Sequence, residues 1–135
     1  MSKAFTSEET PDDELVVRPR APLPPSTPNY VTPRGLAALK EEHRTLEAER
    51  ARVETVSDDA ERRRGATELS VRLTELAARI ATAEVVDPKT LMQDTVHFGA
   101  LVTVRSGSGE RRYQIVGADE ADPAQSRIAF FAPLA

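Results

Sequence analysis

The chain has 135 residues, of which 39% are hydrophobic, 4% aromatic and 30% charged, and its formal net charge is −4. An enzyme that binds its substrate in a pocket needs more apolar and aromatic side chains to line that pocket than this composition provides. A protein that binds DNA on its own needs an excess of positive charge, which this chain lacks. The lack of cysteine excludes disulfides, thiolate zinc sites and a cysteine nucleophile, and two histidines are too few for a histidine-rich metal site.

The sequence contains no long apolar segment. No run approaches the roughly 20 apolar residues of a membrane span, and the N-terminal residues lack the apolar core of a secretory signal. We therefore expect a cytoplasmic protein that does not contact a membrane. We also expect it to act by binding a partner rather than by catalysis in a substrate pocket, because few apolar side chains are available to line one.

Residues 1–31 form a segment rich in proline and acidic side chains. Six of the ten prolines fall within it. Such a segment cannot bury enough apolar surface to offset the entropy lost when it becomes ordered. We expect a disordered tail, which serves either as a docking peptide or linker, or only as a solvating extension.

Residues 32–84 carry the pattern of two amphipathic helices. Thr32 and Pro33 mark a helix start, because threonine caps a helix and proline suits its first position. Apolar residues recur at seven-residue spacing in the first arm, at Leu39, Leu46 and Val53. The second arm has a heptad seam of Leu69, Leu73, Leu76, Ile80 and Ala83. These seams predict an antiparallel helical hairpin, that is, a short coiled coil.

The turn of this hairpin is expected at residues 56–60. It gives two arms of equal length, 33–56 and 60–83, each about 36 Å long at 1.5 Å per residue. A turn at Gly65 is the alternative, because glycine is a good helix C-cap. That alternative ranks second, since it leaves arms of very unequal length.

Residues 85–135 are predicted to form a small antiparallel β domain, so that the fold class is α+β. A β-rich segment at 95–104, a turn at 106–109 and a return strand at 111–117 make a hairpin, and 127–131 adds a third strand. One face of this sheet is apolar, with Phe98, Tyr113, Ile115, Ile128 and Phe130. Nothing in the segment obviously covers that face, so we expect it to be exposed to solvent.

Several segments between residues 29 and 135 form a recognisable series. In order along the chain they are 29–36, 85–87, 96–100 with Phe98-Gly99, 113–122 with Ile115-Val116-Gly117-Ala118-Asp119-Glu120, and 132–135. Together they resemble the Gre family of bacterial transcription elongation factors. The resemblance implies a helical hairpin followed by a β domain like that of FKBP-type prolyl isomerases. The family continues after the last of these segments with a helix and further strands. We therefore expect either a fragment of a longer protein or a partial domain that depends on a partner.

The resemblance also implies a function. A Gre factor binds RNA polymerase through its C-terminal domain and inserts its hairpin into the secondary channel of the polymerase. Acids at the hairpin tip help to hold a catalytic Mg²⁺ of the polymerase, which then hydrolyses backtracked RNA. Such a chain is not an enzyme alone, has no cofactor, metal site or small-molecule substrate of its own, and meets RNA and DNA only within the transcription complex.

The tip acids implied by the resemblance lie at the predicted turn. The family motif Asp-x-x-Glu is matched by Asp58 and Glu61, and Asp59 adds a third carboxylate. By resemblance these residues are the catalytic acids lent to the polymerase. The same spacing is also a capping box for the second helix, and acids in a first turn suit the helix dipole. Capping and metal assistance are compatible, and both interpretations stay open.

Two features near the tip depart from the family pattern. The hairpin is about one heptad shorter per arm than in members that promote cleavage, which is roughly 10 Å of reach. Residues 62–64 are arginines, and the sequence leaves four roles open for them. They repel a metal ion or pair with the tip acids, they contact phosphate, or they form only a solvated basic face. The alternative function is therefore a regulator that occupies the secondary channel without promoting cleavage. A coiled-coil interaction protein with no affinity for the polymerase is the third hypothesis.

The resemblance places polymerase docking in the β domain. Asp119 and Glu120 belong to an acidic loop, and Pro133 lies in the segment that the family places near its docking surface. These residues are the expected docking residues. In the alternative interpretation, Asp119 and Glu120 are ordinary loop acids that favour a turn near Pro123.

Overall fold

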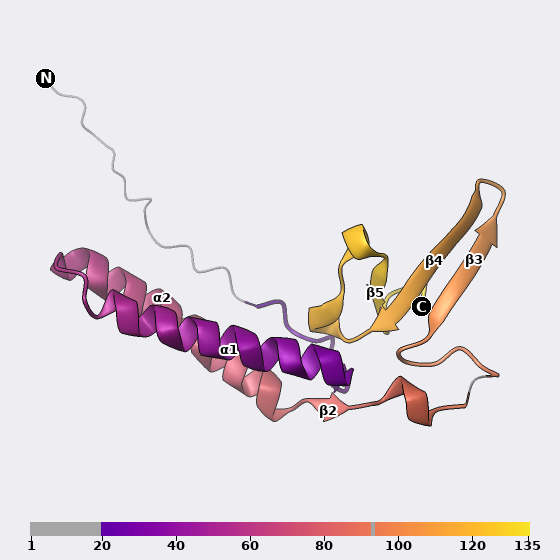
Figure 1. Ribbon diagram of the computed structural model, residues 1–135, viewed down its shortest axis with the longest axis horizontal. Helices are drawn as coiled ribbons and strands as arrows, with labels where there is room; N and C mark the ends of the chain where they lie inside the picture. The colour runs from indigo at the N-terminus through magenta and orange to yellow at the C-terminus, as the bar shows by residue number, and fades with distance from the viewer. Residues whose placement is uncertain (1–19, 93) are drawn as a thin grey trace, which may run out of the picture. The chain divides into compact units, whose positions relative to one another are not determined.

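The computed structural model describes residues 20–92 and 94–135, so most of the predicted tail, residues 1–19, lies outside the described residues. The helices and strands are β1 (Tyr30–Val31), α1 (Pro33–Val53), α2 (Asp59–Ala81), β2 (Glu84–Val85), β3 (Leu101–Ser106), β4 (Gly109–Val116) and β5 (Arg127–Ala129). Short 3-10 turns lie at η3 (Pro88–Thr90), η4 (Ala118–Glu120) and η5 (Pro123–Gln125). Two long helices followed by a small sheet confirm the predicted α+β class (Figure 1).

The chain folds into two compact units. The tip unit comprises Glu42–Ala77 together with residues 20–21, and the base unit comprises Pro22–Glu41 together with Ala78–Ala135. The base unit therefore draws residues from all three segments that the sequence analysis separated. The two ends of the helical hairpin fold with the sheet, although the sequence pattern assigned them to a separate coiled coil.

The turn of the hairpin lies at residues 54–58, close to its predicted position. Gly65, the alternative turn, is inside α2. A Cβ at Gly65 would stand 3.0 Å from the Val53 Cγ1 atom, so this glycine serves close packing between the two arms and does not end a helix. The arms are also shorter than predicted, because α1 ends in a tightened turn in which Val56 N donates to the Val53 carbonyl at 3.0 Å.

The heptad leucines form the core of the tip unit. The exposed fractions of Leu46, Leu69, Leu73 and Leu76 are 3%, 4%, 6% and 0%. Burying one leucine side chain fully contributes about 1.5–3 kcal/mol, so these residues account for much of the stability of the hairpin. The same unit holds Arg20, whose guanidinium donates to Glu42 Oε1 at 2.5 Å and whose backbone N donates to Glu75 Oε2 at 2.9 Å.

The sheet of the base unit has the order β3-β4-β5. β3 and β4 are antiparallel, as predicted, with Ser106 opposite Gly109 across a two-residue connection. β5 instead runs parallel to β4, with Ile115 opposite Ile128. The difference arises because residues 117–126 contain two 3-10 turns and carry the chain back along β4 before it pairs.

The start of the first long strand also differs from the prediction. Residues 95–100 form turns rather than strand, and β3 begins only at Leu101. The bend falls at Gly99, whose φ of 84° lies in the left-handed region that glycine favours. A Cβ at Gly99 would overlap the ring of Pro88, so the chain turns here at a close approach to η3.

A second sheet, which the sequence analysis missed, joins the two ends of the hairpin. β1 and β2 pair in parallel, with Tyr30 opposite Glu84 and Val31 opposite Val85. The sequence analysis placed Tyr30 and Val31 in the tail, Glu84 at the end of the hairpin segment and Val85 at the start of the β domain. The structure moves the tail boundary towards the N-terminus, because Val31 is only 1% exposed and belongs to the core.

Aromatic side chains cover part of the apolar sheet face. The ring of Tyr30 packs against Phe98 and Phe130, with centroid distances of 5.9 and 5.3 Å. Ile115 is 6% exposed. The expected exposure of this face was therefore wrong in part, because a ring from outside residues 85–135, that of Tyr30, covers some of it.

We expect Leu76→Ala to lower the free energy of unfolding by about 2–5 kcal/mol, because it leaves a cavity at a fully buried position. Val71→Ala is the matched control on the same helix, since Val71 is 38% exposed and its loss changes stability by about 0.5 kcal/mol or less. Urea unfolding followed by helical circular dichroism measures both. Equal losses for the two variants contradict the assignment of Leu76 to the core.

Candidate functional site

The predicted tip acids lie together at the beginning of α2. Asp58 precedes the helix, Asp59 is its first residue and Glu61 lies in its first turn. All three residues are exposed. The helix starts here because Asp58 accepts hydrogen bonds from the backbone N of Ala60 at 2.9 Å and of Glu61 at 3.5 Å. The predicted capping by Asp58 is confirmed, whereas the reciprocal hydrogen bond of a capping box, from the Asp58 backbone N to the Glu61 carboxylate, is not formed in the described structure.

The capping hydrogen bonds occupy only some of the carboxylate oxygens at the tip. Both capping hydrogen bonds end on Oδ1 of Asp58. In the described part of the chain, the Oδ2 atom of Asp58 and the Glu61 carboxylate have no hydrogen-bond partner. These oxygens face solvent and remain free to accept a ligand.

The third acid is paired. Asp59 Oδ1 forms an ion pair with Nη2 of Arg62, one helical turn further along. Arg62 also donates from Nη1 to the backbone carbonyl of Val56 at 2.6 Å, so its guanidinium closes the turn. Of the ways in which the arginines can act, pairing with a tip acid is therefore observed for Arg62.

The tip acids do not form a complete set of metal ligands. Among residues 20–92 and 94–135, no group of three or more His, Asp or Glu side chains is arranged to hold a metal ion. Mg²⁺, however, is often bound through one or two carboxylates while water or phosphate completes its coordination. The free oxygens of Asp58 and Glu61 fit that kind of shared coordination, in which a partner supplies the remaining ligands.

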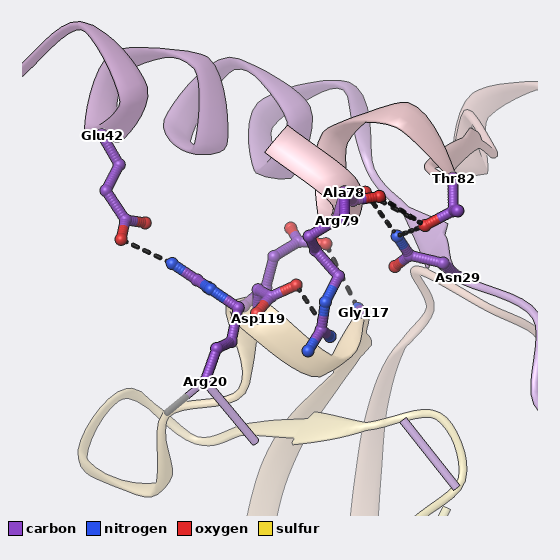
Figure 2. Close-up of polar contacts among 9 residues, drawn as sticks. Arg20, Asn29, Glu42, Ala78, Arg79, Thr82, Gly117 and Asp119 are labelled. Carbon is purple, nitrogen blue, oxygen red and sulfur yellow. Dashed lines mark hydrogen bonds and ion pairs between the residues drawn. The ribbon is translucent and has the colours of Figure 1, made fainter. Parts of the chain in front are cut away.

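The predicted docking acids lie inside the base unit, in η4. Asp119 belongs to η4, and its Oδ2 atom accepts from Nη1 of Arg79 at 3.2 Å (Figure 2). The side chains of Arg79 and Asp119 are 8% and 10% exposed. This ion pair is nearly buried, so Asp119 holds the last turn of α2 against η4.

Glu120 makes the matching contact with the beginning of α1. Its carboxylate accepts from the hydroxyl of Thr32, from the backbone N of Thr32 at 3.1 Å and from the backbone N of Gly117 at 3.2 Å. A Cβ at Gly35 would overlap this carboxylate. Thr32 in turn caps α1, because its Oγ1 accepts from Gly35 N at 3.0 Å.

Asn29 links the chain before β1 to the end of α2. Its side-chain amide donates to the Arg79 carbonyl at 2.8 Å and to the Thr82 hydroxyl at 3.1 Å (Figure 2). Sequence reasoning missed Asn29, Gly35 and Arg79 as contributors to this cluster. Gly35 gave the one usable signal, because a glycine in the first turn of a helix often marks a close approach.

The predicted docking residues therefore have unequal environments. Asp119 and Glu120 are engaged within the base unit, whereas Pro133 is exposed in the turns that follow β5. No helix in the described part of the chain is both long and apolar enough to cross a membrane.

Comparison with known proteins agrees with this architecture. The family model described as "Transcription elongation factor, GreA/GreB, C-term" matches residues 91–135. The chain is 36% identical over 125 residues to the transcription elongation factor GreB of Neisseria meningitidis serogroup A, covering 81% of this chain and 77% of that protein. It is 36% identical over 121 residues to the transcription elongation factor GreA of Brucella canis, covering 78% of this chain and 77% of that protein.

The helical hairpin, the small sheet domain and these relatives define the class of protein as a transcription elongation factor. The chain belongs to the GreA/GreB family of transcription elongation factors, and its role lies in transcription elongation. The resemblance drawn from the sequence is confirmed.

We expect Gly35→Ala to destabilise the protein by about 1–3 kcal/mol, because the new methyl group displaces the Glu120 carboxylate from Thr32 and Gly117. Helix propensity alone would favour alanine by about 1 kcal/mol. In a Glu120→Ala background we therefore expect the same change to be neutral or stabilising. A double-mutant cycle measured by urea unfolding checks this, and strictly additive effects contradict the close contact.

We expect Asp119→Ala to cost about 1.5–3 kcal/mol, because it removes the carboxylate that accepts a charged hydrogen bond from the nearly buried guanidinium of Arg79. Glu110→Ala is the matched control, since Glu110 pairs with Arg105 at the surface, with exposed fractions of 54% and 82%. Such a pair is worth about 0–1 kcal/mol. Equal losses in thermal or urea unfolding argue against a structural role for Asp119.

Proposed function

We propose that this chain binds RNA polymerase through its base unit, inserts the helical hairpin into the secondary channel, and promotes cleavage of backtracked RNA. Membership of the GreA/GreB family supports this proposal. The observation that carries it is the exposed turn of the hairpin, where Asp58 and Glu61 keep carboxylate oxygens free of partners within the described chain. RNA and DNA meet the protein only inside the transcription complex.

The residues of the tip have separate tasks in this proposal. When bound, the Mg²⁺ of the polymerase supplies Lewis-acid activation of the attacking water. Asp58 contributes its Oδ2 atom and is held in place by its capping hydrogen bonds. Glu61 contributes the second carboxylate from the same helical turn. The chain is therefore an accessory to the polymerase and not an enzyme alone.

The docking part of the proposal rests on the base unit. Pro133 offers an exposed contact on the segment after β5. Asp119 and Glu120 act there by holding η4 against the two helix ends, so their effect on docking is through the shape of the surface. Substituting either acid should therefore weaken polymerase binding and folding stability together.

The alternative is a regulator that occupies the channel without promoting cleavage. The pairing of Asp59 with Arg62 favours it, because it withdraws one of the three tip carboxylates. The arms of 21 and 23 residues also favour it, since they span only about 32 and 35 Å. In this alternative the protein inhibits transcription whether or not the tip acids are present.

We expect the double substitution Asp58→Asn and Glu61→Gln to lower the rate of RNA cleavage by about a hundredfold, because carboxylate ligands of the metal are lost. Purified polymerase, backtracked on a defined template, is assayed at fixed Mg²⁺ with each protein. Binding is measured separately by competition with labelled wild-type protein and should be unchanged.

Glu54→Gln is the matched control for this experiment. Glu54 is an exposed acid in the same turn and has no role in the proposed coordination. It should leave cleavage near the wild-type rate. Binding without any stimulation of cleavage by the wild-type protein overturns the proposal in favour of the channel-occupying regulator.

A further inference from the structure

We propose that Arg62 is a positioning residue of the hairpin tip. By pairing with Asp59 it makes that carboxylate unavailable to a shared metal ion, and it thereby lowers the affinity of the tip for the ion. This inference rests on the proposed function and deepens it. It concerns the residues of this chain, and most of it can be tested without the polymerase.

The first support is the geometry of the guanidinium. Nη2 of Arg62 pairs with Asp59 Oδ1, while Nη1 donates to the Val56 carbonyl at 2.6 Å. Val56 lies in the turn and Asp59 is the first residue of α2. The planar fork therefore spans the turn and is fixed at two points, which a flexible ammonium group does less well. Arg62 is also the more buried partner, with 36% of its side chain exposed against 67% for Asp59.

The second support is that the pairing makes the tip acids unequal. Asp58 is committed through one oxygen to the helix cap, and Asp59 is neutralised by Arg62. Glu61 is the acid without a partner in the described structure of the tip. A cation approaching Asp58 and Glu61 thus meets two carboxylates and, beside them, a fixed positive charge. Releasing the guanidinium removes that charge and returns a third carboxylate to the set.

The third support is the contrast with the neighbouring arginine. Arg63 is exposed, and the described residues provide its side chain with no acid partner. An exposed charge on a long, mobile side chain is largely screened at physiological salt. If net charge alone governed the tip, Arg62 and Arg63 would be equivalent. If positioning governs it, only Arg62 matters.

The experiment uses Mn²⁺ as a paramagnetic probe of the full chain in solution. Mn²⁺ broadens the NMR signals of nearby backbone amides, and titration gives an apparent affinity for the tip from the signals of residues 58–61. We expect Arg62→Gln to tighten Mn²⁺ binding about two- to fivefold, the size expected for one solvent-exposed charge pair. We expect Arg63→Gln to match the wild type.

Arg62→Lys separates positioning from charge. It keeps the positive charge but loses the fork, so we expect an affinity between those of the wild type and Arg62→Gln. The proposal is overturned if Arg62→Lys matches the wild type while Arg62→Gln and Arg63→Gln tighten binding equally. It is also overturned if Mn²⁺ broadens none of the tip amides in any variant.

A cleavage assay provides the second measurement. The Mg²⁺ concentration that gives half-maximal RNA cleavage should fall for Arg62→Gln by the same factor as the Mn²⁺ affinity rises, and it should not change for Arg63→Gln. If the Mn²⁺ pattern appears but the wild-type chain stimulates no cleavage, the proposed function fails and the role of Arg62 at the tip stands. If cleavage depends on Asp58 and Glu61 but the Mn²⁺ pattern is missing, only this inference fails.

Discussion

Two adjacent carboxylates on one short turn join the sheet of the base unit to both ends of the helical hairpin. Asp119 binds Arg79 in the last turn of α2, and Glu120 binds Thr32 at the beginning of α1. Breaking such contacts is costly because the groups are shielded from water, and the Arg79–Asp119 pair is nearly buried. Close approach then requires that residue 35 be glycine, since any side chain there overlaps the Glu120 carboxylate.

The charged side chains at the tip of the hairpin contribute differently, because they are not shielded from water. The tip acids are exposed, so an ion pair there contributes little to the free energy of folding. Charge that is buried at the base keeps the fold in place, whereas charge that is exposed at the tip remains available for chemistry. This contrast explains why acids of the same type have a structural role at η4 and a proposed catalytic role beside α2.

The sequence predicted those parts of the structure that have a regular period or a strong local signal. The seam of Leu69, Leu73 and Leu76, the helix start at Thr32 and the turn at residues 106–109 all carry such signals. The cap at Asp58 was likewise readable, because its spacing to Glu61 is local. The candidate tip acids could therefore be found together, although their function rested on family resemblance.

The remaining features depend on contacts between residues that are distant in sequence. β1 and β2 are two-residue strands separated by the whole hairpin, so neither has a pattern of its own. The parallel direction of β5 depends on how residues 117–126 turn, and the burial of Asp119 depends on Arg79, which is 40 positions away. Local composition indicated an exposed acidic loop, and only the tertiary contact reverses that interpretation.

Because β1 and β2 pair in parallel, the entire hairpin is an insertion between two neighbouring strands. The hairpin follows Val31 and ends before Glu84, and both attachment points are fixed by the pairing of β1 with β2, which involves no residue of the tip unit. Matched insertions or deletions of one heptad in each arm would preserve the leucine seam and leave those attachment points unchanged. Hairpin length is therefore a parameter that evolution can adjust in whole-heptad steps without redesigning the domain that carries it.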